Sequence, residues 1–161
     1  MIRHRIIFYL LVCSLAAFPT DFLRAQGRKA AVENTRIQTA DYEGVVFAAE
    51  NRAFAFVFPP PAVAWTPTPE DITRVEELMA DHVRRKAPGI FEKLRRYKRQ
   101  YAGYLQAGKK VVYVNCFCRV RGDVDWEKTE LLVADGGPDF FHVTVDLSGG
   151  ACYDFVVNGS A

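Results

Sequence analysis

One segment of this 161-residue chain carries a long helical pattern, and it constrains the fold more than any other feature. Thr68 is a candidate N-cap, and Pro69 follows at the first helical position, where its missing N–H costs nothing. Apolar residues then recur three and four positions apart, which is the spacing of one buried helical stripe. The stripe consists of Ile72, Val75, Leu78, Met79, His82 and Val83. We predict one amphipathic helix here, with a shorter helical segment at 90–97.

The C-terminal half changes to the period of two that is typical of strands. Segments 101–106 and 110–120 flank Ala107 and Gly108 and predict a hairpin. Further strands are predicted at 129–134, 140–147 and 152–157, separated by glycine-rich turns. The predicted fold class is α+β, with a helical arm packed on a curled antiparallel sheet of four to six strands.

The N-terminal half is expected to hold less regular structure. Residues 27–42 are polar and predict a flexible lead, and residues 43–161 are expected to form a single domain. Two short apolar runs, 45–49 and 53–58, predict strands around a turn. The proline-rich stretch 58–69 predicts an extended connector, since proline removes backbone donors.

Residues 1–26 have the order of an export signal. Arg3, His4 and Arg5 precede an uncharged apolar run at 6–18, which is too short to span a membrane. Cleavage is expected between residues 16 and 27, with positions 25–27 favoured. Lipidation at Cys13 is less favoured, because bulky Val12 stands before it. The sequence therefore predicts a periplasmic or extracellular protein with no transmembrane segment after cleavage.

Charge and composition exclude several classes of function. Removing residues 1–25 takes three of the 21 basic and one of the 19 acidic side chains, which leaves 18 of each. A neutral mature chain does not favour nucleic-acid binding, because that needs a basic surface. No motif predicts a cofactor or a metal, and the expected partner is an unidentified protein or envelope component.

Several short motifs of the C-terminal two thirds resemble a group of uncharacterised bacterial exported proteins. They are Tyr101 with Gly103 and Tyr104, the strand Val114-Asn115-Cys116-Phe117-Cys118, the turn Asp135-Gly136-Gly137, and the strand Tyr153-Asp154-Phe155-Val156-Val157-Asn158-Gly159. The resemblance covers residues 65–161. It implies an exported helix-on-sheet domain of the cystatin or monellin type and brings no known activity.

Three cysteines remain after cleavage, so at least one is expected to be unpaired within the chain. Strand alternation places Cys116 and Cys118 on the core side, too far apart along one strand for easy pairing. Cys152 is the other disulfide candidate, but alternation places it on the opposite face unless a bulge reverses its strand. Buried free thiols, one disulfide to Cys152, and metal or redox chemistry remain as alternatives.

The leading functional hypothesis is a non-catalytic binding or inhibitor-like module. Tyr104, Tyr113 and Phe117 are the candidate contact residues, because alternation places Tyr113 and Phe117 away from the thiol-bearing face. One alternative is a thiol-dependent enzyme or redox protein that uses Cys116 or Cys118 with His82 as base.

A second alternative is a peripheral module that binds anionic surfaces through the basic segment 84–99. Its contact residues would be Arg95, Arg96, Lys98 and Arg99. Solvated charge on the exposed side of a helix is the simpler explanation of the same segment.

Overall fold

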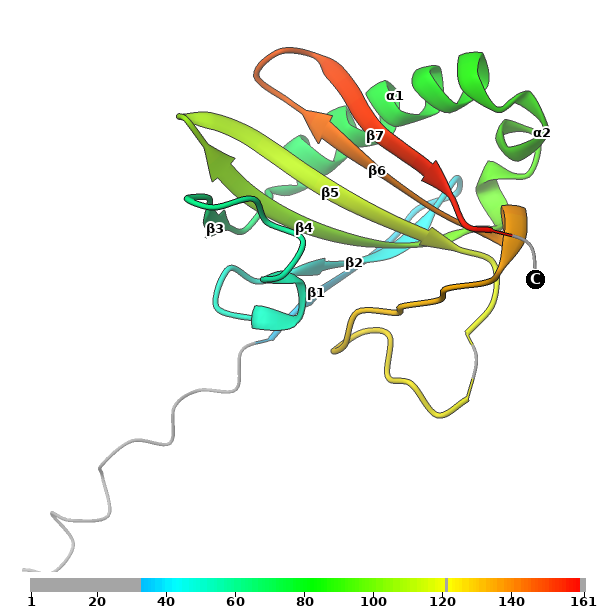
Figure 1. Ribbon diagram of the computed structural model, residues 1–161, viewed down its shortest axis with the longest axis horizontal. Coiled ribbons are helices and arrows are strands. Elements are labelled where there is room, and N and C mark those ends of the chain that lie inside the picture. Colours follow the sequence, from blue (N-terminus) through cyan, green and yellow to red (C-terminus); the bar gives the residue numbers. More distant parts are fainter. Residues whose placement is uncertain (1–32, 121, 160–161) are drawn as a thin grey trace, which may run out of the picture. The chain divides into compact units, whose positions relative to one another are not determined.

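The computed structural model describes residues 33–120 and 122–159, which form a seven-stranded sheet with one long helix on one face (Figure 1). The order is β1-β2-β4-β5-β6-β7, and β3 also pairs with β4. All pairs are antiparallel except β2 with β4, which is parallel. The strands are β1 (Thr35–Gln38), β2 (Glu43–Phe47), β3 (Val63–Trp65), β4 (Lys98–Gln106), β5 (Lys109–Phe117), β6 (Phe140–Asp146) and β7 (Ala151–Val157). The predicted export signal at 1–26 lies outside the described residues.

The C-terminal meander confirms the α+β, mainly antiparallel prediction. Strands β4 and β5 pair along their whole length and close on a two-residue turn. Ala107 and Gly108 both take positive φ there, of 49° and 79°, as a tight hairpin requires. Gly149 and Gly150 lie in the turn between β6 and β7.

Four local predictions in the irregular segments were wrong. Part of the expected flexible lead forms β1, and part of the expected connector forms β3, so the sheet has seven strands rather than four to six. Segment 53–58 holds no strand and begins within a short 3-10 helix, η2 (Arg52–Phe54). Segment 129–134 is irregular backbone.

Both missed strands exist through partners that are distant in sequence. β1 pairs with β2, and β2 in turn lies beside β4, more than 50 residues away. β3 pairs with the far half of β4, where a Cβ on Gly103 would lie 2.6 Å from the carbonyl oxygen of Trp65. Local composition cannot predict these pairings, because strand formation depends on the neighbouring strand.

The main helix begins where the sequence predicts. In α1 (Pro69–Lys86) the Thr68 side chain accepts a hydrogen bond from the Asp71 N–H, and the Asp71 carboxylate accepts one from the Thr68 N–H. This reciprocal capping box satisfies two N–H groups at the helix start. Two short elements follow, α2 (Pro88–Phe91) and η3 (Leu94–Arg96), in place of the predicted segment 90–97.

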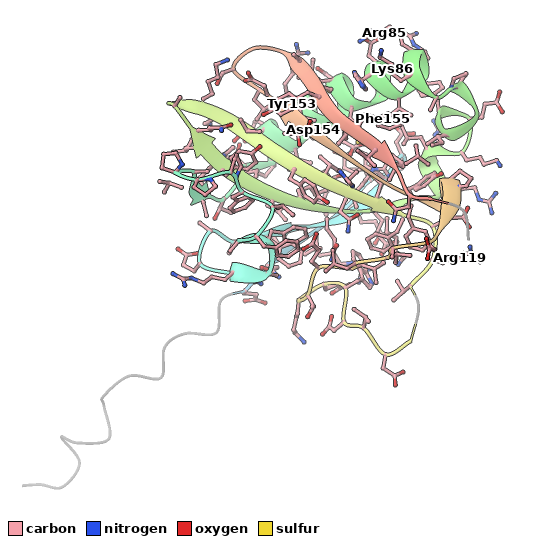
Figure 2. All side chains as sticks on the ribbon, viewed as in Figure 1. Arg85, Lys86, Arg119, Tyr153, Asp154 and Phe155 are labelled. Atoms are coloured by element: carbon pink, nitrogen blue, oxygen red, sulfur yellow. The ribbon has the colours of Figure 1, made fainter. Side chains whose placement is uncertain are left out.

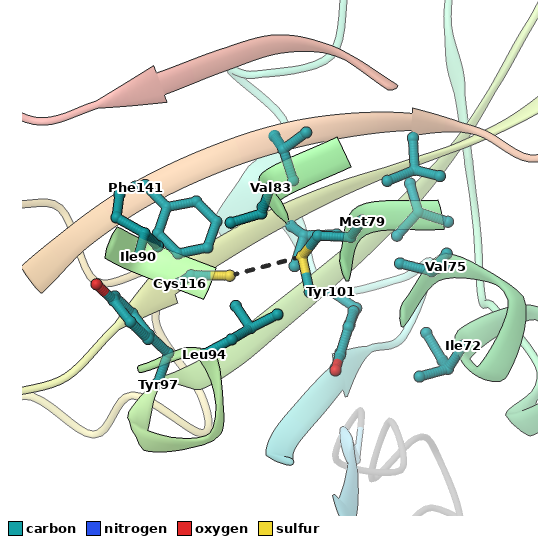
Figure 3. Close-up of a cluster of buried hydrophobic side chains, with 14 of the residues drawn as sticks. Ile72, Val75, Met79, Val83, Ile90, Leu94, Tyr97, Tyr101, Cys116 and Phe141 are labelled. Carbon is teal, nitrogen blue, oxygen red and sulfur yellow. Dashed lines mark hydrogen bonds between the residues drawn. The ribbon is translucent and has the colours of Figure 1, made fainter. Parts of the chain in front are cut away.

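The main core lies between α1 and the sheet (Figure 3). It joins the helical stripe to side chains of β4, β5 and β6 that share one face. Its fully buried members include Ile72, Val75, Met79, Val83, Tyr101, Val112, Val114, Cys116, Val143 and Val145. Every second residue of these strands faces the helix, so the intervening residues face the other way.

That other face is covered by two loops instead of a helix (Figure 1). Segment 48–62 joins β2 to β3, and segment 118–139 joins β5 to β6. Phe54 of the first loop packs on Phe47, and Leu131 of the second packs with Phe117 and Phe140. The sheet therefore has a helical side and a loop side. No helix among residues 33–159 is long and apolar enough to cross a membrane.

Candidate ligand-binding site

Two buried amide side chains fasten the longer loop to the sheet. Nε2 of Gln100 donates to the carbonyl oxygens of Trp126 and Thr129, at 2.6 and 2.7 Å. Its Oε1 accepts from the Leu131 N–H and from Nδ2 of Asn115, both at 3.0 Å. Because all these groups are satisfied, the loop has a defined position across β4 and β5.

The same loop is tied to the N-terminal strands. Nδ2 of Asn34 donates to the Glu127 carbonyl oxygen at 2.7 Å, while Oδ1 of Asn34 accepts from the Ala48 N–H. The ammonium group of Lys98 lies 4.7 Å from the ring centroid of Trp126, within range of a cation–π contact. Residues ahead of the predicted domain start thus help to position the loop side.

A cavity of about 810 Å³ lies on the loop side. Its floor is the sheet, with Tyr104, Tyr113 and Thr144 among the contributing residues. Its walls come from both loops and from β7. The wall residues are Phe56, Val57, Pro59, Glu130, Leu131, Leu132, Val133, Tyr153, Asp154, Val156 and Asn158. This size suits a small organic ligand.

One wall residue of the cavity, Glu130, is buried without a partner. The residue is 6% exposed, and both carboxylate oxygens lack a hydrogen-bond partner among the described residues. Burial raises the pKa of Glu130 to about 7, because a charged carboxylate loses its hydration there. Buried polar groups in folded proteins are nearly always paired, so an unpaired carboxylate beside a cavity makes Glu130 a candidate site residue.

The groups around Glu130 are aromatic or weakly titrating. Burial raises the pKa of Tyr113, and the negative charge of Glu130 adds to this effect. Burial lowers the pKa of His142, whose ring centroid lies 5.4 Å from that of Tyr113, while Asp154 opposes the shift. His142 is therefore neutral at pH 7, and Glu130 and Asp154 are the acidic groups of the cavity lining.

Removing the carboxylate of Glu130 should change how stability depends on pH. The folded-state pKa of Glu130 is about 7, above its ordinary value of 4.5, so the folded protein binds more protons between these values. The contribution of Glu130 to stability is therefore fully present below pH 4.5 and is lost as the pH rises through 7. We expect Glu130→Gln to gain about 2 kcal/mol over the wild type between pH 5 and pH 8, allowing for solvent at the cavity mouth.

Chemical denaturation of both proteins at several pH values measures this difference. Glu127→Gln is the matched control, since Glu127 stands three residues earlier in the same loop and pairs with Arg36 outside the cavity. The free energy of unfolding of Glu127→Gln should change with pH in the same way as that of the wild type. If the free energy of unfolding of Glu130→Gln also changed with pH as that of the wild type does, the raised pKa of Glu130 would be contradicted.

The structure places the three predicted contact residues in different environments. Tyr104 and Tyr113 both line the cavity, although Tyr104 is only 4% exposed. Phe117 does not: it is fully buried, and its ring packs edge-on against Trp126, with the centroids 5.6 Å apart. The expectation that Phe117 is an exposed aromatic was wrong, because segment 118–139 folds back over it.

The cysteines lie in the core on the helical side. Cys116 is fully buried, with its Sγ 3.9 Å from the Sδ of Met79 (Figure 3). Cys118 packs at the edge of the same core, as alternation predicts. Burial raises the pKa of Cys116, Cys118 and Cys152, the last to about 11. None of these environments favours a thiolate, which a nucleophilic cysteine needs.

Cys152 lies on the helical side, against the expectation from simple alternation. The pairing of β7 with β6 shifts register between His142 and Thr144, and Asp154 takes a positive φ of 48°. This bulge turns Cys152 and Phe155 toward the helix and leaves Tyr153 at the cavity. The sequence left a bulge open as the feature that would reverse this strand, and the structure contains that bulge.

All three described cysteines are free thiols. Cys152 pairs with Val145, which pairs with Val112, four residues before Cys116. Two strand spacings and four residues put Cys152 and Cys116 about 16 Å apart, beyond the reach of a disulfide. We expect all three thiols to be alkylated after denaturation without reductant, with Cys116 protected in the folded protein. Peptide mass spectrometry measures this, and a Cys116–Cys152 crosslink would contradict it.

No hydrogen bond joins His82 to a cysteine in the described part of the chain. Its ring packs edge-on against Phe155, with the centroids 5.7 Å apart, and burial lowers its pKa. Residues 33–120 and 122–159 hold no group of three or more His, Cys, Asp or Glu side chains that could bind a metal.

The basic segment 84–99 is only partly exposed: Arg95 and Arg96 are exposed, whereas Arg99 is buried. Arg99 is 1% exposed and is bound to Glu76 inside the core, and Lys98 contacts Glu43. Arg95 is exposed and pairs with Asp41. Figure 2 shows Arg85 and Lys86 at the far end of α1, and Arg85 pairs with Asp81. The expectation that Arg99 contacts an anionic surface was wrong.

Glu130, His142 and Asp154 were not predicted as site residues. The one local signal at Glu130 is an acidic residue followed directly by Leu131, Leu132 and Val133. Nothing in the sequence indicated a cavity beside His142 or Asp154.

No protein-family model, curated protein or solved structure matches this chain, so its function has to be inferred from the cavity itself.

Proposed function

We propose that this protein is a non-catalytic binding module that holds a small organic ligand in the loop-side cavity. The observation that carries the proposal is Glu130, a buried carboxylate without a partner in the wall of a cavity of about 810 Å³. Maintaining such a group lowers stability, and proteins tolerate that cost mainly where a ligand compensates it. Tyr104 and Tyr113 supply the apolar floor.

The proposal also includes the export signal predicted at residues 1–26 and a partner that is not yet identified. A charged segment before a short apolar run supports secretion to the periplasm or outside the cell. One helix against a mainly antiparallel sheet is compatible with the cystatin or monellin type, and with the exported-protein group that the sequence resembles. Under this proposal the partner is a small molecule of the envelope or its surroundings.

Blocking the cavity tests this function. Val156 is 46% exposed at the cavity wall, so Val156→Trp places a large ring over the opening without disturbing the core. Val63→Trp is the matched control, because Val63 is 63% exposed on β3 and does not line the cavity.

Ligand-observed NMR with a mixed set of small aromatic compounds gives the readout. We expect binding to the wild type and to Val63→Trp, and at least fivefold weaker binding to Val156→Trp. Absence of any binding to the wild type, or equal binding to both variants, would contradict the proposal.

A further inference from the structure

The charge of the cavity indicates which ligand it takes. Of the described residues that line it, none is lysine or arginine, while Glu130 and Asp154 carry carboxylates. The only other group in the lining that titrates near neutral pH is His142, and burial keeps it uncharged at pH 7. An anionic ligand would meet two like charges and no compensating cation.

Aromatic rings complete the same chemical preference. Tyr104, Tyr113 and Phe140 of the sheet and Tyr153 of the wall all line the cavity. Ring faces attract a cation through their quadrupoles, and this attraction adds to that of a carboxylate. Tyr113 and Glu130 both line the cavity, and the negative charge of Glu130 raises the pKa of Tyr113.

We propose that the cavity binds a small organic cation, an ammonium or amidinium group on an apolar body, which pairs with the carboxylate of Glu130. This inference rests on the proposed function and adds the ligand class to it. Both Glu130 oxygens are covered by neighbouring protein atoms, so the side chain has to turn toward the cavity to meet the cation, which then supplies the hydrogen-bond donors that these oxygens lack. The apolar body occupies the space between Tyr104, Tyr113 and Tyr153.

A protonated Glu130 could instead donate to a neutral acceptor ligand. The lining argues against this as the main mode, because Asp154 makes the potential more negative and favours a bound positive charge. Binding of a cation also favours the ionised carboxylate, so cation affinity should rise with pH through 7. The affinity for a neutral acceptor ligand would instead fall as the pH rises, because only a protonated Glu130 can donate a hydrogen bond.

Three probes of similar shape separate these possibilities: 2-phenylethylammonium, 2-phenylethanol and 3-phenylpropionate. Titration calorimetry or protein NMR at pH 8 and pH 5.5 measures their affinities. We expect the ammonium probe to bind at least tenfold more tightly than the alcohol at pH 8, and the carboxylate to bind most weakly. The advantage of the ammonium probe should shrink at pH 5.5, where Glu130 is protonated.

Two variants test whether Glu130 causes the preference for the ammonium probe. Glu130→Gln should weaken the ammonium probe at least tenfold and change the alcohol less than twofold, while Glu127→Gln should change neither. Equal affinity of the wild type for ammonium and alcohol, or tighter binding of the carboxylate, would overturn the cation proposal and leave the binding function in place. Failure of all three probes would overturn both. The comparison of probes on the wild type stands even if a variant does not fold.

Discussion

Replacing Glu76 with glutamine is expected to lower the free energy of unfolding by about 3–5 kcal/mol. Glu76 extends from α1 toward the sheet, where its Oε1 accepts from Nε of Arg99 at 3.1 Å and from the Tyr101 hydroxyl at 2.8 Å. The guanidinium also donates to the carbonyl oxygens of Tyr97 and Leu94. Without the carboxylate, Arg99 keeps its charge where almost no solvent reaches it.

The neighbouring residue provides a matched control. Glu77 stands next on the same helix, but its pair with Arg74 lies in solvent, so Glu77→Gln should cost at most about 1 kcal/mol. Urea unfolding followed by circular dichroism measures both variants. Similar losses for the two would show that the pair of Glu76 and Arg99 does not hold α1 to the sheet.

Replacing Gln100 with alanine is expected to cost about 2–4 kcal/mol and to loosen the loop over the cavity. The Gln100 amide satisfies the carbonyl oxygens of Trp126 and Thr129 and the N–H of Leu131. Alanine would leave these three backbone groups and one donor of Asn115 without their present partner. Since Glu130 lies between two of the anchored residues, the carboxylate should lose its defined position.

Hydrogen exchange separates this local effect from general destabilisation. We expect faster exchange in segment 125–133 of Gln100→Ala, with much smaller changes in α1. Gln38→Ala serves as control, because Gln38 is exposed at the end of β1. Unchanged exchange in 125–133 would contradict the anchoring role, whatever the change in overall stability.

The sequence determined the elements whose signals are local. The helix start at Thr68 and Pro69 and the turn at Ala107 and Gly108 follow from capping and backbone preferences within a few residues. Alternation also assigned the faces of β5, and so placed Cys116 in the core and Tyr113 on the other side. None of these predictions depends on contacts between segments that are distant in sequence.

Packing between distant segments selects which side chains on the loop side of the sheet are buried and which line the cavity. Phe117 and Tyr113 alternate identically, yet a returning loop covers the first and leaves the second at the cavity. The bulge at Asp154 reverses the faces of β7 through its pairing with β6. Glu130 is buried because amides of β4 and β5 hold its loop in place. Burial and pKa depend on contacts between distant segments, so a local sequence pattern cannot contain them.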